Sequence, residues 1–82
     1  MTLDIKVLGP GCANCENLEK NARAAAAQLG IDAIFEKVKD RAEYPRYGLL
    51  YTPGLAFNGQ LVSAGRVPSV AEITTLLANF LA

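Results

Sequence analysis

The segment Gly9-Pro10-Gly11-Cys12-Ala13-Asn14-Cys15 decides how this chain is interpreted. It contains both cysteines of the protein, two residues apart, and the sequence has no histidine. Glycine and proline interrupt regular secondary structure, so the segment separates the element before it from the element after it. The sequence on either side shows which elements it joins.

On the N-terminal side, Leu3–Leu8 predicts a β-strand. Apolar residues alternate with polar ones, so that one face of the strand is apolar throughout. Leu8 adds an apolar residue to the other face, which favours a central position in a sheet.

On the C-terminal side, the pattern from Ala13 to Leu29 has the period of an α-helix. Apolar residues recur at steps of three and four and predict one buried stripe, made of Cys15, Leu18, Ala22, Ala25 and Leu29. Gly30 follows at a position where a helix C-cap favours positive φ. Ile31–Val38 predicts a second strand. A strand, a helix and a strand in this order form a βαβ unit, whose strands are parallel and whose crossover is right-handed.

The middle of the chain predicts a short helix and a hairpin. Asp40 can cap one or two helical turns that end at Gly48, and Pro45 is expected to interrupt them unless it lies in the first turn. Asn58-Gly59 is a strong signal for a tight turn and predicts two antiparallel strands, Leu55–Phe57 and Leu61–Ala64.

The last helix begins at a capping box. In Pro68-Ser69-Val70-Ala71-Glu72, the side chain of Ser69 can cap the helix while that of Glu72 reaches back. The helix is expected to run to about Phe80 and to bury Val70, Ile73, Leu77 and Phe80 or Leu81. The predicted order is β-α-β-α-β-β-α, in one α/β domain over residues 1–82.

Composition narrows the function classes. The chain has 82 residues, of which 51% are hydrophobic, enough for one packed core. Eight basic residues balance eight acidic ones, which argues against a nucleic-acid-binding protein. Lys37 and Lys39 are expected at a solvated strand edge.

No apolar run approaches the roughly 20 residues that span a bilayer, and the N-terminus does not look like a signal peptide. We therefore expect a soluble, cytoplasmic monomer.

The spacing of the two cysteines suits disulfide exchange. A thiolate attacks a disulfide sulfur and a second nearby thiol resolves the mixed disulfide. Cys12 is predicted at a helix N-terminus, where the helix dipole and free N–H groups favour a thiolate. Cys15 is predicted one turn further on, on the buried stripe. These positions assign Cys12 as the nucleophile and Cys15 as the resolving thiol, with Gly11 leaving room for a substrate backbone.

Two structural interpretations of the pair are weaker. A bond between residues so close in sequence would remove little chain entropy, so a structural disulfide is not expected. Structural zinc usually takes four ligands, which two cysteines without histidine do not supply.

Over essentially its whole length the sequence resembles the thioredoxin superfamily, in particular its small, glutaredoxin-sized redox proteins of archaea and bacteria. The matching motifs are Gly9–Cys15, Tyr47-Gly48, Thr52-Pro53 before the hairpin, and Gly65-Arg66-Val67-Pro68-Ser69. The resemblance implies a thioredoxin-like fold, with a four-stranded mixed sheet and helices on both faces. It also implies that Pro53 is a cis-proline beside the cysteines, and that Thr52 presents its backbone to an extended substrate.

The chain departs from the better-known motifs of this superfamily. Tryptophan is absent, so Trp-Cys-Gly-Pro-Cys does not occur, and Ala13-Asn14 also differs from Cys-Pro-Tyr-Cys. The redox potential and the natural reductant are therefore open at this point.

Two other functions are compatible with parts of the sequence. The start of the chain is also similar to a heavy-metal-associated domain, in which two thiolates carry Cu(I). Such domains usually have Met where Pro10 stands and end on a strand, whereas a capped helix is predicted here. The other alternative is a non-catalytic adapter with a hydrophobic surface around Tyr51, Pro53 and Leu55.

The function predicted from the sequence is that of a thiol–disulfide oxidoreductase. The pair Cys12 and Cys15 would exchange two electrons with a protein disulfide, and a disulfide reductase would supply electrons. No bound cofactor and no metal is expected, because the sulfurs carry the electrons.

Overall fold

The computed structural model describes residues 2–82 and has seven elements in the predicted order. They are β1 (Leu3–Leu8), α1 (Ala13–Leu29), β2 (Ala33–Val38), the 3₁₀ helix η1 (Arg41–Tyr47), β3 (Gly54–Phe57), β4 (Gln60–Ala64) and α2 (Val70–Leu81).

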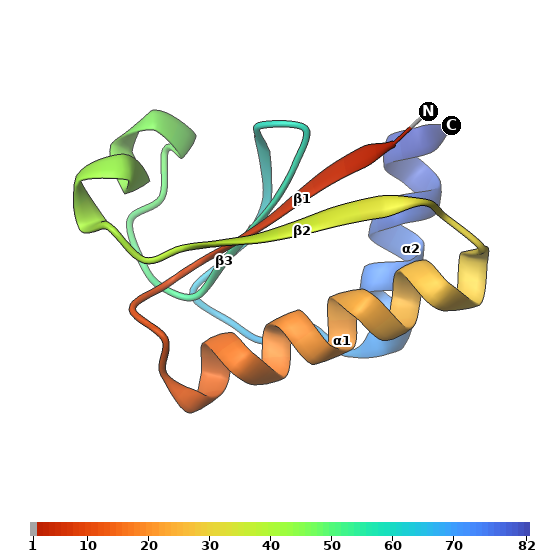
Figure 1. Ribbon diagram of the computed structural model, residues 1–82, viewed down its shortest axis with the longest axis horizontal. Helices are drawn as coiled ribbons and strands as arrows, with labels where there is room; N and C mark the ends of the chain where they lie inside the picture. The colour runs from red at the N-terminus through yellow and green to blue at the C-terminus, as the bar shows by residue number, and fades with distance from the viewer. Residues whose placement is uncertain (1) are drawn as a thin grey trace.

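The strands form one mixed sheet in the order β2-β1-β3-β4 (Figure 1). β1 is parallel to β2, whereas β1 and β3, and β3 and β4, are antiparallel. The parallel pair has α1 as its crossover, as the βαβ interpretation predicts. β1 is central, which agrees with the apolar residues on both of its faces.

The main core lies between one face of the sheet and the two α-helices. Ile5 and Val7 of β1 and Leu55 and Phe57 of β3 pack there against α1 and α2. From α2 this core receives the fully buried Ile73 and Leu77. Phe80 adds an edge-on contact to Phe57, with ring centroids 5.5 Å apart.

The opposite face of the sheet is covered in part by η1. Leu8 and Ala56 form a second cluster with Tyr44 and Leu49, which come from η1 and the segment after it. Helices therefore lie on both faces, as the fold resemblance implied. Beside this cluster the face carries Lys6, whose ammonium pairs with Asp4 at 3.1 Å and Glu36 at 2.9 Å.

The C-terminal end of α1 corrects two predictions. β2 begins at Ala33 and not at Ile31, because the Ile31 N–H donates to Ala26 O at 2.9 Å and belongs to the cap of α1. Gly30 has φ 66°, as predicted. Leu29 was predicted to be buried but is 41% exposed. It lies in the last turn, beside the cap, where few neighbours cover it.

The segment after β2 forms a short helix of the predicted length. η1 passes through Pro45 and ends at Gly48, with Asp40 accepting from Ala42 N at the cap. The expected interruption by Pro45 was wrong, since a 3₁₀ helix of two turns loses only one hydrogen bond to the missing N–H.

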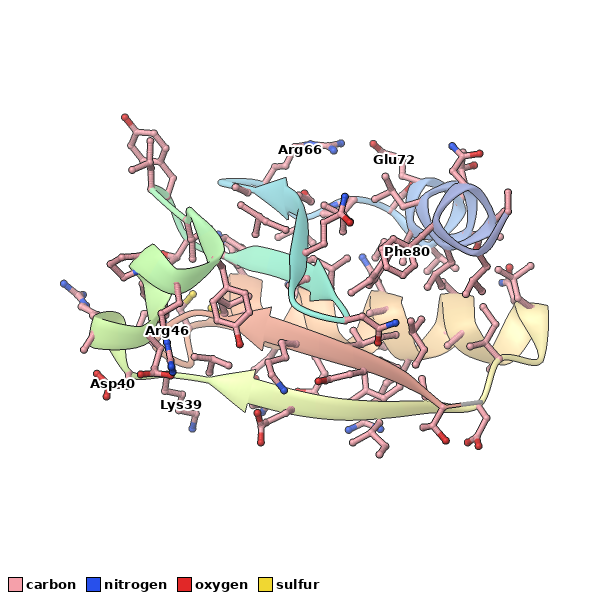
Figure 2. The ribbon with its side chains drawn as sticks, turned by 90° about the horizontal axis from the view of Figure 1, so that it is seen from above. Lys39, Asp40, Arg46, Arg66, Glu72 and Phe80 are labelled. Carbon is pink, nitrogen blue, oxygen red and sulfur yellow. The ribbon has the colours of Figure 1, made fainter. Side chains whose placement is uncertain are left out.

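The hairpin and the last helix match their sequence signals. Asn58 and Gly59 have φ values of 50° and 84°, as a tight turn requires. Ser69 and Glu72 form both hydrogen bonds of the capping box. Glu72 also pairs with Arg66, and these two side chains point toward one another in Figure 2. Leu81, one of two candidates for burial near the end of α2, is 53% exposed.

Both ends of the described chain lie at the same end of the sheet. Thr2 and Leu81 line one shallow hollow, and the two ends are neighbours in Figure 1. The loop from β1 to α1 lies at the other end of β1. None of the helices among residues 2–82 has the length and apolar character that crossing a membrane requires.

Two leucines of α2 provide a matched test of this packing. Replacing Leu77, which is fully buried, by alanine should lower the free energy of unfolding by about 2–5 kcal/mol, because it leaves a cavity in the main core. Leu81→Ala, at a half-exposed position of the same helix, should cost less than about 0.5 kcal/mol. Urea denaturation monitored by circular dichroism measures both changes. An equal loss of unfolding free energy in the two variants would contradict the packing of α2 described above.

Candidate active site

The loop between β1 and α1 places Cys12 at the start of the helix. Gly9 N–H donates to Val38 O at 2.9 Å, which continues the pairing of β1 with β2. Gly11 then turns the chain with φ 91°. Cys12 is the N-cap of α1, and its carbonyl accepts the first helical hydrogen bond from Glu16 N at 3.1 Å. Its sulfur therefore lies where the unpaired N–H groups of the helix favour a negative charge.

The two cysteines are neighbours with different exposure. Their Sγ atoms are 3.1 Å apart and both are free thiols. Cys12 is exposed, whereas Cys15 is 3% exposed and lies on the buried face of α1. An external group can therefore approach the Cys12 sulfur, while Cys15 is within reach only of its neighbour.

The same arrangement moves the two thiol pKa values in opposite directions. The Cys15 thiol, followed by the Cys15 backbone N–H, lowers the pKa of Cys12 because both stabilise its thiolate. Burial, followed by the neighbouring Cys12 sulfur, raises the pKa of Cys15. In the reduced pair Cys12, the accessible sulfur, is therefore the thiol that loses its proton first.

Gly9 is a residue of this site that the sequence analysis did not single out. A Cβ on Gly9 would lie 2.2 Å from Cys15 Sγ, far inside the contact distance. Its φ is not positive, so this contact and not the backbone torsion requires glycine. The break Gly9-Pro10-Gly11 was visible in the sequence, but the contact with Cys15 depends on how α1 packs against the end of β1.

Thr52-Pro53, directly before β3, lies beside Gly9 and the cysteine loop. The peptide bond between them is cis, which confirms what the resemblance implied. Pro53 is buried, its carbonyl accepts from Gly65 N at 2.9 Å, and its Cα is 3.9 Å from the Cβ position of Gly9. Thr52 is exposed. Among residues 2–82, no other backbone group forms a hydrogen bond with the N–H or the C=O of Thr52.

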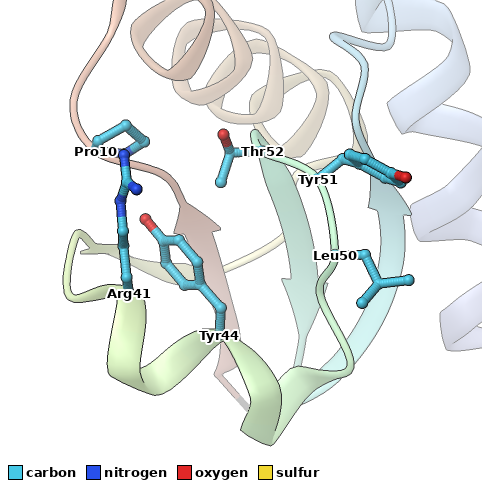
Figure 3. A pocket seen from close by; sticks show the side chains of 6 residues that line it. All are labelled: Pro10, Arg41, Tyr44, Leu50, Tyr51 and Thr52. Carbon is cyan, nitrogen blue, oxygen red and sulfur yellow. The ribbon is translucent and has the colours of Figure 1, made fainter.

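An open hollow of about 430 Å³ adjoins the cysteine loop. Figure 3 shows the six side chains that line it, Pro10, Arg41, Tyr44, Leu50, Tyr51 and Thr52. The Tyr44 hydroxyl donates to Lys39 O at 3.4 Å. Burial, followed by the nearby Cys15, raises the pKa of Tyr44, so it remains a neutral phenol beside the thiols. Arg41 and Leu50 carried no sequence motif and were not predicted.

The hydrophobic surface proposed for an adapter is composed differently from the prediction. Of Tyr51, Pro53 and Leu55, only Tyr51 is exposed, because Pro53 and Leu55 pack into the interior. The apolar side chains that reach solvent here are Leu50, 86% exposed, and Tyr51, 73% exposed.

The metal-carrier alternative finds no further support in the structure. The chain ends on α2 and not on the strand expected of a heavy-metal-associated domain. In the part of the chain that the structure describes, no three His, Cys, Asp or Glu side chains are grouped to hold a metal ion, but a carrier of Cu(I) on two thiolates would not need a third ligand.

Comparison with known proteins identifies the family. The model of the thioredoxin domain family matches residues 3–78. A thioredoxin of Methanothermobacter thermautotrophicus is 50% identical over 76 residues, which cover 93% of this chain and 99% of that protein. A thioredoxin of Methanocaldococcus jannaschii is 39% identical over 77 residues, which cover 94% of this chain and 88% of that protein.

A mixed four-stranded sheet with a Cys-X-X-Cys pair at the start of its first helix defines a thiol–disulfide oxidoreductase of the protein-disulfide type. With the family model and both relatives covering nearly all of its length, the chain belongs to the thioredoxin domain family.

The contact between Gly9 and Cys15 gives a first test. Gly9→Ala should lower the free energy of unfolding by about 1–3 kcal/mol, because the added methyl overpacks the site. It should also speed alkylation of Cys15 by displacing its sulfur. Gly54→Ala is the matched control, since a Cβ there would meet Leu49 Cδ1 at 2.6 Å and no sulfur. It should cost stability and leave the alkylation of both cysteines unchanged. Denaturation and peptide mass mapping measure the two effects.

The lowered pKa of Cys12 gives a second test. Only the thiolate reacts with iodoacetamide, so the pH midpoint of Cys12 alkylation should lie below that of a cysteine in an unstructured peptide. Cys15→Ala removes the largest cause of the shift and should move that midpoint upward. Mass spectrometry of the labelled peptide across a pH series measures it. A midpoint that is the same in both proteins would disprove the assigned cause.

Proposed function

We propose that Cys12 is the nucleophile and Cys15 the resolving thiol of this oxidoreductase. The observation that carries the proposal is the contrast in exposure between two sulfurs only 3.1 Å apart. A substrate disulfide can approach Cys12 but not the buried Cys15. The lowered pKa of Cys12 favours the thiolate that the attack requires.

The reaction proceeds in two exchanges. The Cys12 thiolate attacks one sulfur of the substrate disulfide, forms a mixed disulfide, and releases the other substrate sulfur as a thiolate that takes up a proton. Cys15 then loses its proton and attacks Cys12 Sγ, which releases the second substrate thiol and leaves a Cys12–Cys15 disulfide. Two electrons have passed to the substrate, and no bound cofactor is required.

Cys15 becomes the better nucleophile once the mixed disulfide has formed. In the reduced pair the Cys12 sulfur raises the pKa of Cys15, and bonding that sulfur to the substrate removes its negative charge. Burial, the largest cause of the raised pKa, remains, and it also keeps other disulfides away from Cys15. The second exchange is therefore directed to Cys12.

We propose that Gly11 and Thr52 form the surface on which the substrate backbone lies, and that Pro53 holds Thr52 in place. Gly11 and Thr52 are exposed on two sides of the cysteine loop, and an extended peptide can hydrogen-bond to the backbone of Thr52. Pro53 is buried and adjoins Thr52 in the chain, so its proposed role is to position Thr52 and not to contact the substrate.

The reduced dithiol has to be restored after each turnover. A disulfide reductase is the proposed electron donor, and proteins with an accessible disulfide are the proposed acceptors. We propose the cytoplasm as the compartment, because reducing conditions there maintain thiols. The nucleophilic and the resolving sulfur both belong to one chain, so a single-domain monomer is sufficient for activity.

Single substitutions of the cysteines test the two roles. Cys12→Ser should reduce the turnover of a protein disulfide such as insulin to the level without protein, because serine does not attack sulfur. Cys15→Ser should form the mixed disulfide with substrate and fail to release it. Reduction of insulin measures turnover, and mass spectrometry under non-reducing conditions detects the trapped species. Full turnover by Cys12→Ser would refute the proposal.

A further inference from the structure

Two cationic side chains near the cysteine loop pair with no carboxylate of residues 2–82. Among residues 2–82, five of the eight Lys and Arg side chains form ion pairs, namely Lys6, Arg23, Lys37, Arg46 and Arg66. No carboxylate of the described residues pairs with Lys20, Lys39 or Arg41. Two of these three lie next to the loop that carries Cys12.

Lys39 lies over the glycine that precedes Cys12. It follows β2, and its side chain extends past the end of that strand in Figure 2. A Cβ on Gly11 would be 3.5 Å from Lys39 Cε and 3.7 Å from Nζ. The ammonium group therefore lies close to Gly11, one residue before Cys12, although Lys39 itself is exposed.

Arg41 lines the hollow on the other side of the same loop. It is the first residue of η1, and in Figure 3 its guanidinium extends toward Pro10. The Tyr44 hydroxyl points in the same direction. Asp40, between the two cations in sequence, accepts the N–H of Ala42 at 3.0 Å and caps η1. Glu43 pairs with Arg46 at 2.8 Å. Neither of these acidic groups forms an ion pair with Lys39 or Arg41.

The lining of the hollow also indicates the kind of ligand. Leu50 and Tyr51 offer exposed apolar surface there, which a free inorganic anion would not use. A peptide segment can place an apolar side chain on them and an acidic one at Arg41. Charges arranged in this way give specificity and faster association more than raw affinity.

We propose that Lys39 and Arg41 select peptide disulfides with an acidic residue beside the cysteine that is attacked. The inference rests on the proposed role of Cys12, since it places the substrate by the sulfur that it exposes. Arg41 pairs with the acidic side chain in the hollow, and Lys39 adds positive potential across Gly11.

Two peptide disulfides that differ only in Glu or Gln beside the attacked cysteine test the proposal. With excess reductant at low ionic strength, the ratio of kcat/KM for the Glu peptide to that for the Gln peptide should be about two to five. Arg41→Gln and Lys39→Gln should each bring the ratio closer to one. Lys20→Gln removes the same charge at an exposed position on α1 and should keep the ratio of the unaltered protein.

Salt gives a further test of charge selection, and the results that would overturn charge selection differ from those that would overturn the proposed function. Raising the ionic strength to about 1 M shortens the screening length to about 3 Å, so the ratio should then fall toward one. A ratio of one in the unaltered protein, or a ratio that survives both Arg41→Gln and Lys39→Gln, overturns charge selection and leaves the proposed function standing. Failure to reduce either peptide would instead overturn the proposed function, and the inference with it.

Discussion

The fold and the site both depend on the way β1 is held. It is hydrogen-bonded to β2 on one side and to β3 on the other, and Val7 and Leu8 near its end are buried on opposite faces. A strand fixed in this way has no freedom to shift register, because a shift by one residue would exchange its two faces. The residue that follows, Gly9, therefore has a defined position, and the remainder of the site is placed relative to it.

Three segments meet at that position, two of them consecutive in the chain and the third distant in sequence. The loop after β1 brings Cys12, α1 brings Cys15 against Gly9, and the chain entering β3 brings Pro53. A spacing of three residues at a helix start gives the two cysteines opposite environments, one toward solvent and one toward the sheet. The opposite pKa shifts of the thiols follow from this single geometric fact.

Local signals in the sequence were sufficient for most of the fold. The capping box at Ser69, the turn at Asn58 and the period of α1 each depend on residues within a few positions of one another, and each predicted its element correctly. Leu29 was predicted wrongly because the helical period indicates a face and not whether a neighbour covers it.

Contacts between distant segments account for what the sequence did not predict in the site. The need for glycine at position 9 arises from a sulfur on the following helix, and the burial of Leu55 from two helices that pack on β3. The cysteine pair was recognisable because its chemistry is encoded in a short motif. Arg41 was not, because an arginine becomes noteworthy only when its neighbours leave it without a partner.

The position of the chain ends has a consequence for how this protein can be joined to others. Thr2 and Leu81 lie together at one end of the sheet, and the thiols lie at the other end of β1. A strand of six residues spans about 20 Å. A second domain fused to either terminus would thus be anchored on the side away from the thiols. Such a fusion would leave the exposed Cys12 sulfur open to substrates.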